Sequence, residues 1–221
     1  MEDTLKKVDD AVVNNKCIHH SVINAGKVVL MQKDHVLTQS VVTADLINAD
    51  GQSIVWAARF LGLSIPERVA GIDLMESLIS LSHKNSYKCF FLGASKEVIE
   101  ELVSKYSKKY SKNMIAGYRN GYFNSDEEKD VIEEITNSGA NILFVAITSP
   151  KKEIFLNRYK EDLKCINFIM GVGGSFDVIA GKVKRAPLGA QKLGLEWLYR
   201  LLQEPRRMWK RYLVGNLKFI Y

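Results

Sequence analysis

The stretch CINFIMGVGGSFD, residues 165–177, constrains the fold more than any other part of the sequence. Its first seven residues are almost all apolar, which is typical of a strand buried on both faces of a parallel sheet. The glycines that follow allow a ligand to approach the backbone closely, and the N-terminus of a following helix favours an anion. We therefore predict a strand, a ligand-binding loop and a helix in succession.

Four other short apolar runs have the same character: residues 44–48 (ADLIN), 88–92 (KCFFL), 113–118 (NMIAGY) and 141–147 (NILFVAI). Amphipathic segments between them predict helices over residues 95–110, 126–137 and 150–159. Strands that alternate with helices form right-handed βαβ units. The predicted fold is therefore α/β, a Rossmann-like and mostly parallel sheet flanked by helices.

Charge divides the chain into two parts. Its 221 residues carry a net charge of +6, but residues 182–221 hold ten Lys or Arg against only Glu196 and Glu204. The first 181 residues carry 21 basic and 23 acidic groups, a net charge of −2. We predict a catalytic body over residues 1–181 and a basic, aromatic, helical appendage over residues 182–221. Its composition fits a membrane-surface helix and also RNA binding, so composition alone does not decide between them.

The appendage is predicted to contain one helix over residues 188–203 and a second helix that begins at Pro205. In the body, the polar N-terminal segment MEDTLKKVDD excludes a secretory signal peptide. No apolar run approaches the roughly 20 residues that cross a bilayer. Cys89 and Cys165 lie in apolar runs and are interpreted as buried thiols in a reducing compartment. The chain is therefore predicted to be cytoplasmic.

Loops that follow predicted strands carry the candidate site residues, because ligands of doubly wound sheets bind at that edge. Asp50, in the sequence Asp50-Gly51, either faces a substrate, caps the next helix or makes a turn. Arg68 suits phosphate, or forms a surface ion pair with Glu67 or Asp73, and Asp73 itself is a predicted helix N-cap. Lys151 or Lys152 either reaches a diphosphate or belongs to a solvated helix start.

The glycine loop favours one class of ligand over another. In residues 171–177, Phe176 occupies the place of the last glycine of a dinucleotide fingerprint, and the acidic residue expected about 20 positions later is replaced by Arg185 and Ala186. A nicotinamide oxidoreductase is therefore disfavoured, whereas a nucleoside diphosphate fits. The four histidines and three cysteines show no metal-ligand spacing, and Asp45 lies within a strand rather than beside Asp50. We predict no metal and no cofactor.

These segments together resemble the WecG/TagA/CpsF glycosyltransferase family, glycosyltransferase family 26. The resemblance is collinear from about Asn24 to the C-terminus. It rests on the motifs ADL with Asp50-Gly51, PERV with Gly71 and Asp73-Leu74, FLGA, GYF, Pro150-Lys151 with Glu153, GVGG with Phe176-Asp177, Gly181 with Arg185-Ala186-Pro187, GLEW with Tyr199-Arg200-Leu201, and EPRR.

The resemblance implies a GT-E type fold and an inverting, metal-independent transfer of a sugar from a UDP-sugar to a polyprenyl-diphosphate-linked saccharide. The sugar would be N-acetylmannosamine, its uronic acid or a related hexose, used for cell-surface polysaccharide. The implied location is peripheral, on the inner face of the cell membrane. The implied partners are therefore the UDP-sugar, the lipid-linked acceptor and an anionic membrane surface, with no nucleic acid. Self-association through the aromatic appendage stays open.

The resemblance also implies roles for individual residues. Asp50 would be the general base that takes the proton of the acceptor hydroxyl. Substrate or phosphate would be bound by Asn24, Arg68, Lys152, Arg200, Arg206, Arg207 and Arg211. The nucleotide would be bound by Gly93, Tyr122, Gly171, Gly173, Gly174, Phe176 and Asp177.

The sequence departs from the family pattern at two positions. Lys152 replaces a glutamine, and Val22 stands where a threonine is common. The added lysine charge suits an acidic donor sugar or compensates for a missing metal, or else marks a degenerate member that binds nucleotide or lipid diphosphate without sugar transfer. The chain also starts at its first predicted helix, so a leading strand typical of the family is expected to be absent.

Overall fold

A computed structural model describes residues 1–65 and 67–220, together with their side chains except those of Lys192, Arg207, Lys210, Arg211 and Ile220. At its centre is one six-stranded sheet with the strand order β2-β1-β6-β5-β3-β4, in which every pair of neighbours is parallel. The strands are β1 (Ile18–Ile23), β2 (Leu46–Ala49), β3 (Cys89–Gly93), β4 (Ile115–Arg119), β5 (Ile142–Ala146) and β6 (Phe168–Gly171). The predicted α/β class is confirmed.

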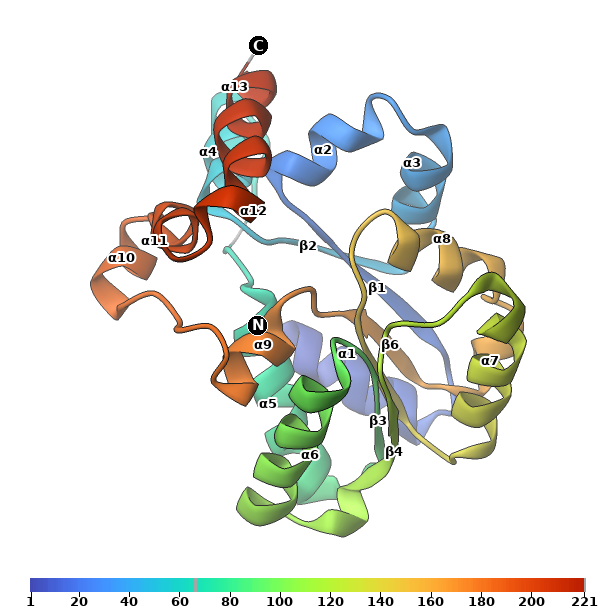
Figure 1. Cartoon of the computed structure of the whole chain (residues 1–221). Coiled ribbons are helices and arrows are strands. Elements are labelled where there is room, and N and C mark those ends of the chain that lie inside the picture. The colour runs from blue at the N-terminus through green and yellow to red at the C-terminus, as the bar shows by residue number, and fades with distance from the viewer. Residues whose placement is uncertain (66, 221) are drawn as a thin grey trace.

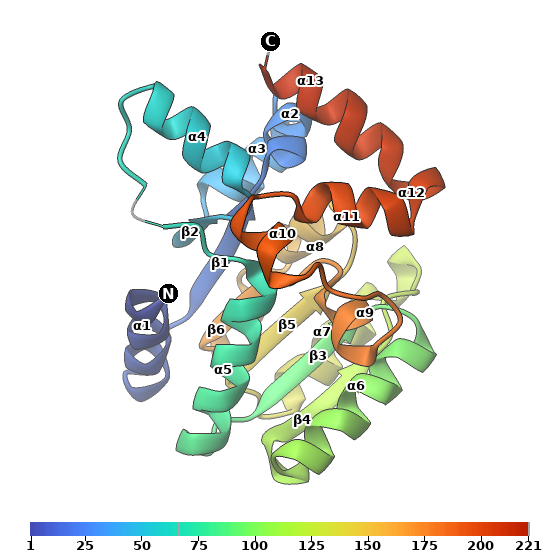
Figure 2. The same ribbon diagram turned by 90° about the vertical axis from the view of Figure 1, so that its left-hand side faces the viewer.

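Helices cover both faces of the sheet (Figures 1 and 2). One face carries α1 (Glu2–Val13), α5 (Gly71–Asn85), α6 (Lys96–Lys109) and α9 (Ser175–Ala180). The other face carries α7 (Glu128–Asn137), α8 (Lys151–Arg158) and the 3-10 turn η3 (Asp162–Cys165), with α2 (Ala25–Met31) and α3 (His35–Val42) beside α8. Helix α4 (Gln52–Phe60) extends beyond the sheet, and η1 (Lys112–Met114) and η2 (Ser125–Glu127) are short connections.

The placement of the helices follows from the handedness of the crossovers. Connections that move toward β2 in the strand order run over the α7–α8 face, and those that move toward β4 run over the α5–α6 face. This is the arrangement that right-handed βαβ units require. All six strands therefore end at one edge, where the loops that follow them gather.

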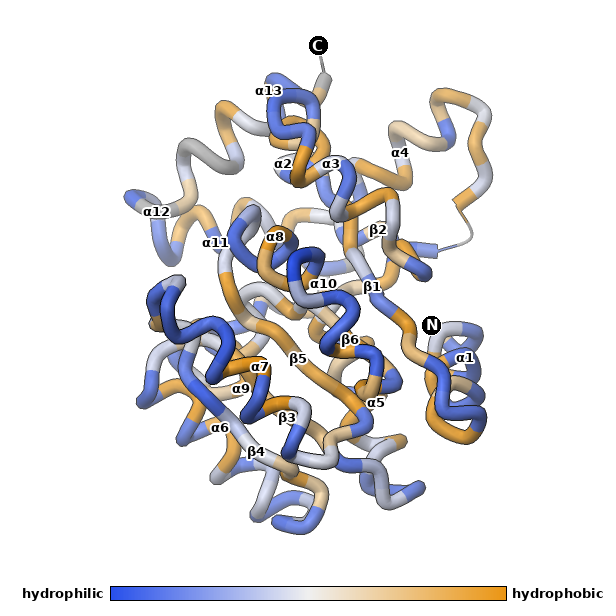
Figure 3. The backbone as a smooth tube through the Cα atoms, turned by 90° about the vertical axis from the view of Figure 1, so that its right-hand side faces the viewer, coloured by the Kyte–Doolittle hydropathy of each residue, from blue (hydrophilic) through white to orange (hydrophobic). Residues whose placement is uncertain are grey.

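Aromatic rings pack together at the centre of the core, around the central strands. Phe91 of β3 is fully buried and its ring stacks against that of Phe144 of β5, with 5.6 Å between centroids. Phe176 of α9 meets the same ring edge-on at 6.0 Å. Figure 3 shows hydrophobic residues along the central strands and hydrophilic residues on much of the helical shell. A rigid sheet thus supports the loops at its carboxyl edge.

Two strand predictions need correction. Strand β6 begins at Phe168, because residues 162–165 form the turn η3, and Cys165 is exposed rather than buried. Strand β1 was not predicted at all, since its sequence IHHSVI carries two histidines and a serine among only three apolar residues. It nevertheless occupies an interior position between β2 and β6.

After α9 the chain leaves the sheet and forms α10 (Leu188–Lys192), α11 (Glu196–Gln203), α12 (Pro205–Trp209), the π-helical turn η4 (Lys210–Val214) and α13 (Gly215–Ile220). The single helix predicted over residues 188–203 is wrong. Gly194 breaks it with φ +71°, and a Cβ there would lie 2.9 Å from the Cβ of Gln52. The break lets the chain cross closely over the start of α4 before α13 packs against α2 (Figure 2).

No helix among the described residues is both long enough and apolar enough to cross a membrane. The division of the chain at residue 182 remains a prediction.

Candidate active site

The candidate general base lies where two paired strands end. Asp50 follows β2 and Asn24 follows β1, and the backbone N–H of Asp50 donates to the carbonyl of Ile23 at 2.8 Å. A Cβ on Gly51 would lie 3.9 Å from the Cβ of Asn24, and one on Gly71 would lie 4.0 Å from Oδ2 of Asp50. The carboxylate of Asp50 therefore lies beside the start of α5, and the backbone at Gly51 lies beside the start of α2.

Asn24 has a structural task at this point. Its side-chain oxygen accepts a hydrogen bond from the backbone N–H of Lys27 at 3.0 Å and so caps α2. Gly51 occupies the N-cap position of α4. Asp50 is therefore not the N-cap residue of α4, and the interpretations that it faces a substrate or makes a turn stay open.

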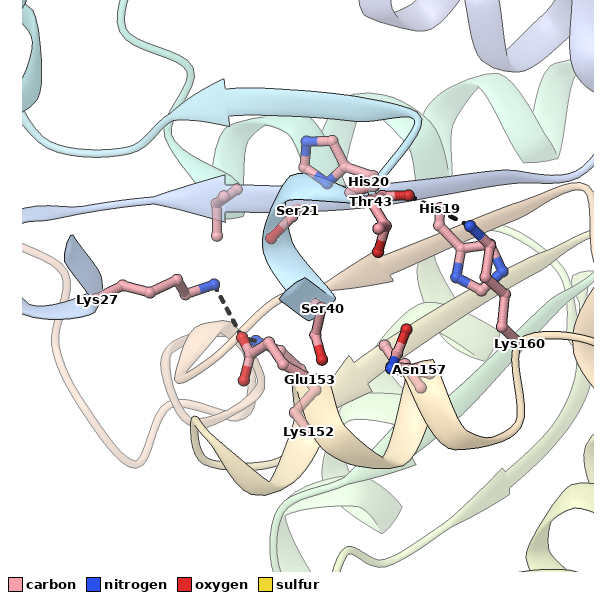
Figure 4. A pocket seen from close by; sticks show the side chains of 14 residues that line it. His19, His20, Ser21, Lys27, Ser40, Thr43, Lys152, Glu153, Asn157 and Lys160 are labelled. Carbon is pink, nitrogen blue, oxygen red and sulfur yellow. Dashed lines mark hydrogen bonds and ion pairs between the residues drawn. The ribbon is translucent and has the colours of Figure 1, made fainter. Parts of the chain in front are cut away.

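A buried cluster of charges lies beside these loops (Figure 4). The ammonium of Lys27 lies 2.8 Å from Oε1 of Glu153, and that of Lys152 lies 3.2 Å from the same oxygen. All three side chains are less than a tenth exposed. Charges in such a place persist only when they are paired, so Glu153 holds both lysines. Two cations against one carboxylate leave the cluster with an excess positive charge.

Burial and mutual attraction shift the ionisation of the cluster in opposite directions. Burial and, secondarily, the nearby Lys152 ammonium lower the pKa of Lys27 to about 8, although Glu153 and Asp50 oppose the change. Burial also tends to raise the pKa of Glu153, but the two ammonium groups outweigh it and bring that pKa down to about 2. Glu153 is therefore ionised at neutral pH, and Asp50 lies within electrostatic reach of Lys27.

A cavity of about 40 Å³ separates this cluster from β1 and α3. His20 lines it, is 5% exposed, and its Nε2 lies 3.0 Å from Oδ1 of Asn48. Burial lowers the pKa of His20 to about 4, so the ring is neutral at pH 7. A space of this size holds about three water molecules and is too small for a sugar. The cavity beside the cluster is therefore not a binding site for a sugar.

The glycine loop after β6 lies against two cations. A Cβ on Gly171 would lie 2.5 Å from Cε of Lys152, so the lysine stem passes directly over the glycine. A Cβ on Gly174 would lie 2.9 Å from Nη2 of Arg200, which approaches the Gly174 carbonyl at 3.5 Å. Gly173 is exposed with φ +54°. Lysine from the body and arginine from the C-terminal segment thus flank one loop.

Two arginine–carboxylate pairs attach the C-terminal segment to the body. Arg68 pairs with Glu196 of α11, which corrects the expected partners Glu67 and Asp73. Arg185 binds Asp73 through both of its Nη atoms, at 2.6 and 2.7 Å. Asp73 lies within the first turn of α5 and is not its N-cap, which is Ala70. The guanidinium of Arg68 was predicted to bind phosphate. In the structure it binds Glu196 and so positions α11.

Four predicted nucleotide-binding residues lie elsewhere or serve the fold. The ring of Phe176 is fully buried in the core, so its side chain serves the fold and only its backbone is left for the predicted nucleotide contact. Gly93 has φ +128°, and a Cβ there would lie 2.5 Å from the backbone of Ala146, so the sheet itself requires this glycine. Tyr122 is 80% exposed in a separate hollow after β4, and Asp177 is half-buried in the first turn of α9.

The remaining arginines lie in α12 and η4. Arg206 is exposed on α12. The side chains of Arg207 and Arg211 lie outside the described part of the structure, so their predicted roles stay predictions.

Sequence reasoning missed Lys27, Glu153 and His20. The available signal was a lysine four residues after the end of β1, together with the adjacent Lys152 and Glu153. It needed the unpredicted strand β1 to place Lys27 at the same edge. No group of three or more His, Cys, Asp or Glu side chains suited to a metal ion occurs in residues 1–65 and 67–220.

An all-parallel sheet with a carboxylate, several cations and a glycine loop at the carboxyl ends of its strands is characteristic of α/β proteins that bind phosphate-bearing ligands there. The chain belongs to the WecG/TagA/CpsF family of glycosyl transferases, whose pattern it matches over residues 1–221. It is 37% identical over 171 residues to an N-acetylglucosaminyldiphosphoundecaprenol N-acetyl-beta-D-mannosaminyltransferase of Bacillus spizizenii. That match covers 77% of this chain and 65% of the relative, so the chain spans less than two thirds of the relative's length.

Proposed function

We propose that the chain is an inverting, metal-independent glycosyltransferase that moves N-acetylmannosamine, its uronic acid or a related hexose from a UDP-sugar to a polyprenyl-diphosphate-linked saccharide. The relative's name specifies an N-acetylmannosaminyl donor group and an undecaprenyl-diphosphate-linked N-acetylglucosamine acceptor. The observation that carries the proposal is the position of Asp50, at the carboxyl ends of β1 and β2 and beside a cluster with excess positive charge. Neither a metal nor a cofactor enters the proposed reaction.

In this mechanism Asp50 removes the proton of the acceptor hydroxyl as its oxygen attacks the anomeric carbon. The new glycosidic bond forms on the face opposite the UDP, the bond from the anomeric carbon to the UDP oxygen breaks, and UDP leaves with the electron pair. The configuration at the anomeric carbon is therefore inverted. A general base typically contributes about 10²- to 10⁴-fold to the rate.

Cations around the glycine loop would stabilise the departing diphosphate. Lys152 crosses Gly171 and Arg200 reaches Gly174, so both lie next to the place where a phosphate would meet the loop. Because Lys27 binds the same Glu153 oxygen, it keeps this carboxylate paired when the Lys152 ammonium turns toward the ligand. Further positive charge near the diphosphate would come from four arginines of neighbouring elements: Arg68, Arg206, Arg207 and Arg211. The reaction would take place at the inner face of the cell membrane.

The test is UDP release from a panel of UDP-sugars with a short-chain polyprenyl-diphosphate–GlcNAc acceptor. We expect acceptor-dependent release that survives EDTA and falls at least about 100-fold in Asp50→Asn. Asp162→Asn is the matched control, since Asp162 is exposed at the opposite end of β6. Inhibition by EDTA would overturn metal independence. UDP binding without release from any donor would instead support a degenerate member in which Lys152 replaces the family's glutamine.

A further inference from the structure

Helix α4 ends in an apolar tip, residues 56–63, that the body does not cover. Phe60 is 91% exposed, Leu61 69% and Leu63 61%, and Trp56, one turn earlier on α4, is 58% exposed. Removing such side chains from water is favourable, so their shared exposure indicates a surface that a partner covers. Figure 3 shows hydrophobic residues along most of this helix.

The tip is a built structure rather than a frayed helix end. The backbone N–H of Leu63 donates to the carbonyl of Ala58 at 2.8 Å, and that of Gly62 donates to Arg59 at 3.1 Å. Gly62 has φ +72°. This pair of bonds is the Schellman arrangement that closes a helix with a left-handed glycine. The apolar side chains are therefore held outward in a fixed shape.

Helix α4 links the tip directly to the candidate base. Asp50 and Gly51 immediately precede α4, and the nine residues of the helix span about 14 Å. Figures 1 and 2 show α4 and α13 projecting at the same end of the molecule. Trp209 and Leu217, in α12 and α13, add exposed apolar side chains there.

The positive charge around the α4 tip favours an anionic partner. Residues 52–63 contain Arg59 and no acidic residue, and the neighbouring residues 182–221 carry a net charge of +8. Two copies of such an end repel each other, whereas an anionic lipid surface attracts both the arginine and the basic segment. Exposed large apolar side chains beside basic residues are the composition of segments that enter the membrane interface.

We propose that the α4 tip inserts into an anionic lipid bilayer as an apolar anchor distinct from the basic C-terminal segment, and that α4 thereby sets Asp50 about one helix length from the lipid. This proposal rests on the proposed function in one respect: a lipid-linked acceptor gives the enzyme a reason to bind the membrane. The interaction surface itself follows from the exposure and charge of residues 52–63.

The experiment measures flotation of the full chain with vesicles of phosphatidylglycerol and phosphatidylethanolamine. The double variant Phe60→Ser, Leu63→Ser is expected to lower vesicle binding at least tenfold and to keep the thermal stability of the wild type, because both side chains are exposed. Val13→Ser is the matched control: Val13 is 73% exposed on α1, away from that end (Figure 2).

Two assays of UDP release distinguish failure of this proposal from failure of the proposed function. UDP release with a water-soluble short-chain acceptor should be the same in the double variant and the wild type, while release with acceptor embedded in vesicles should fall. If no variant or wild-type protein releases UDP but the double variant still loses vesicle binding, the anchor stands and the enzymatic proposal fails.

Unchanged vesicle binding in the double variant would overturn the anchor. Sedimentation provides the last outcome: if the wild type is a dimer that the double variant dissociates while vesicle binding is unaffected, the tip joins two copies of the chain and the proposal is wrong.

Discussion

Residues 1–181 are held together by two apolar core clusters, one on each face of the sheet, whereas the described part of residues 182–220 is joined to the body by ion pairs and by packing of α13 against α2. Among the described residues of the C-terminal segment, the buried hydrophobic side chains are those of Val183, Ala186 and Met208. The attachment uses the pairs Arg68–Glu196 and Arg185–Asp73. Apolar packing depends little on salt, but ion pairs weaken as salt screens them. Stability should therefore reside in the body, and salt sensitivity in the C-terminal segment.

The strongest test of this contrast removes a ring from the core. Phe91→Ala is expected to lower the free energy of unfolding by about 3–5 kcal/mol, because the Phe91 ring is fully buried against three other aromatic rings. Urea denaturation measures the change. Phe60→Ala, made on an exposed ring, should stay within about 0.5 kcal/mol of the wild type. A loss below about 1 kcal/mol for Phe91→Ala would show that the core does not dominate stability.

A second test assigns pH dependence to the body. The pKa of His20 is about 4 in the folded chain against 6.5 in the unfolded chain, so the unfolded chain binds more protons between these values. Stability therefore falls as pH drops from 6.5 to 4, by up to about 3 kcal/mol. Urea denaturation across this range should show a slope that His20→Gln flattens.

His35→Gln, made on an exposed histidine, should keep the wild-type slope. An equal slope in His20→Gln and the wild type would mean that other groups cause the acid sensitivity. Glu153 contributes a separate loss at lower pH, since its folded pKa of about 2 is below its ordinary 4.5.

The smallest stability effect is expected where the two parts meet. Glu196→Gln removes the partner of Arg68, and because the pair is only partly buried, the free energy of unfolding should change by about 1 kcal/mol or less. Acceptor-dependent UDP release should nevertheless fall about tenfold, since α11 carries Arg200 to the glycine loop.

Glu161→Gln is the control for this change, because it breaks an exposed ion pair with Lys164 away from the interface. Its activity should match that of the wild type at every salt concentration. Unfolding of the whole body by Glu196→Gln would instead show that the C-terminal segment belongs to the same cooperative unit.

Much of the fold could be predicted because five strands are short apolar runs. Such runs are the sequence pattern typical of strands in a buried parallel sheet. Strand β1 was not predicted because half of its residues are polar. His20 is buried there with Asn48 as partner, and a hydrogen bond formed across strands leaves no local pattern. The buried cluster was not predicted for the same reason. The pairing of β1 with β6 is what brings Lys27 to Glu153, and this pairing could not be inferred without β1.

The candidate site was predicted in part for a similar reason. Asp50 and the glycine loop lie at strand ends, where position along the chain indicates position in space. The sequence could not show that the Phe176 ring faces the core, because adjacent residues at a helix start point in different directions and only packing decides which one is buried. The predicted nucleotide-binding role of this loop stays a prediction. The partner of Arg68 lies 128 residues away, beyond the reach of any local spacing.

The pairing of β1 with β6 sets the order in which the protein can assemble during synthesis. Ile18 pairs with Phe168, so 150 residues separate the two partners along the chain. At about 5–20 residues per second, the ribosome needs on the order of ten seconds or more to supply the second strand after the first. Until then β1 has only the short edge strand β2 beside it, and an isolated strand pair is marginally stable. The sheet therefore closes late, and the glycine loop of the site emerges just before the segment that carries Arg200 to it.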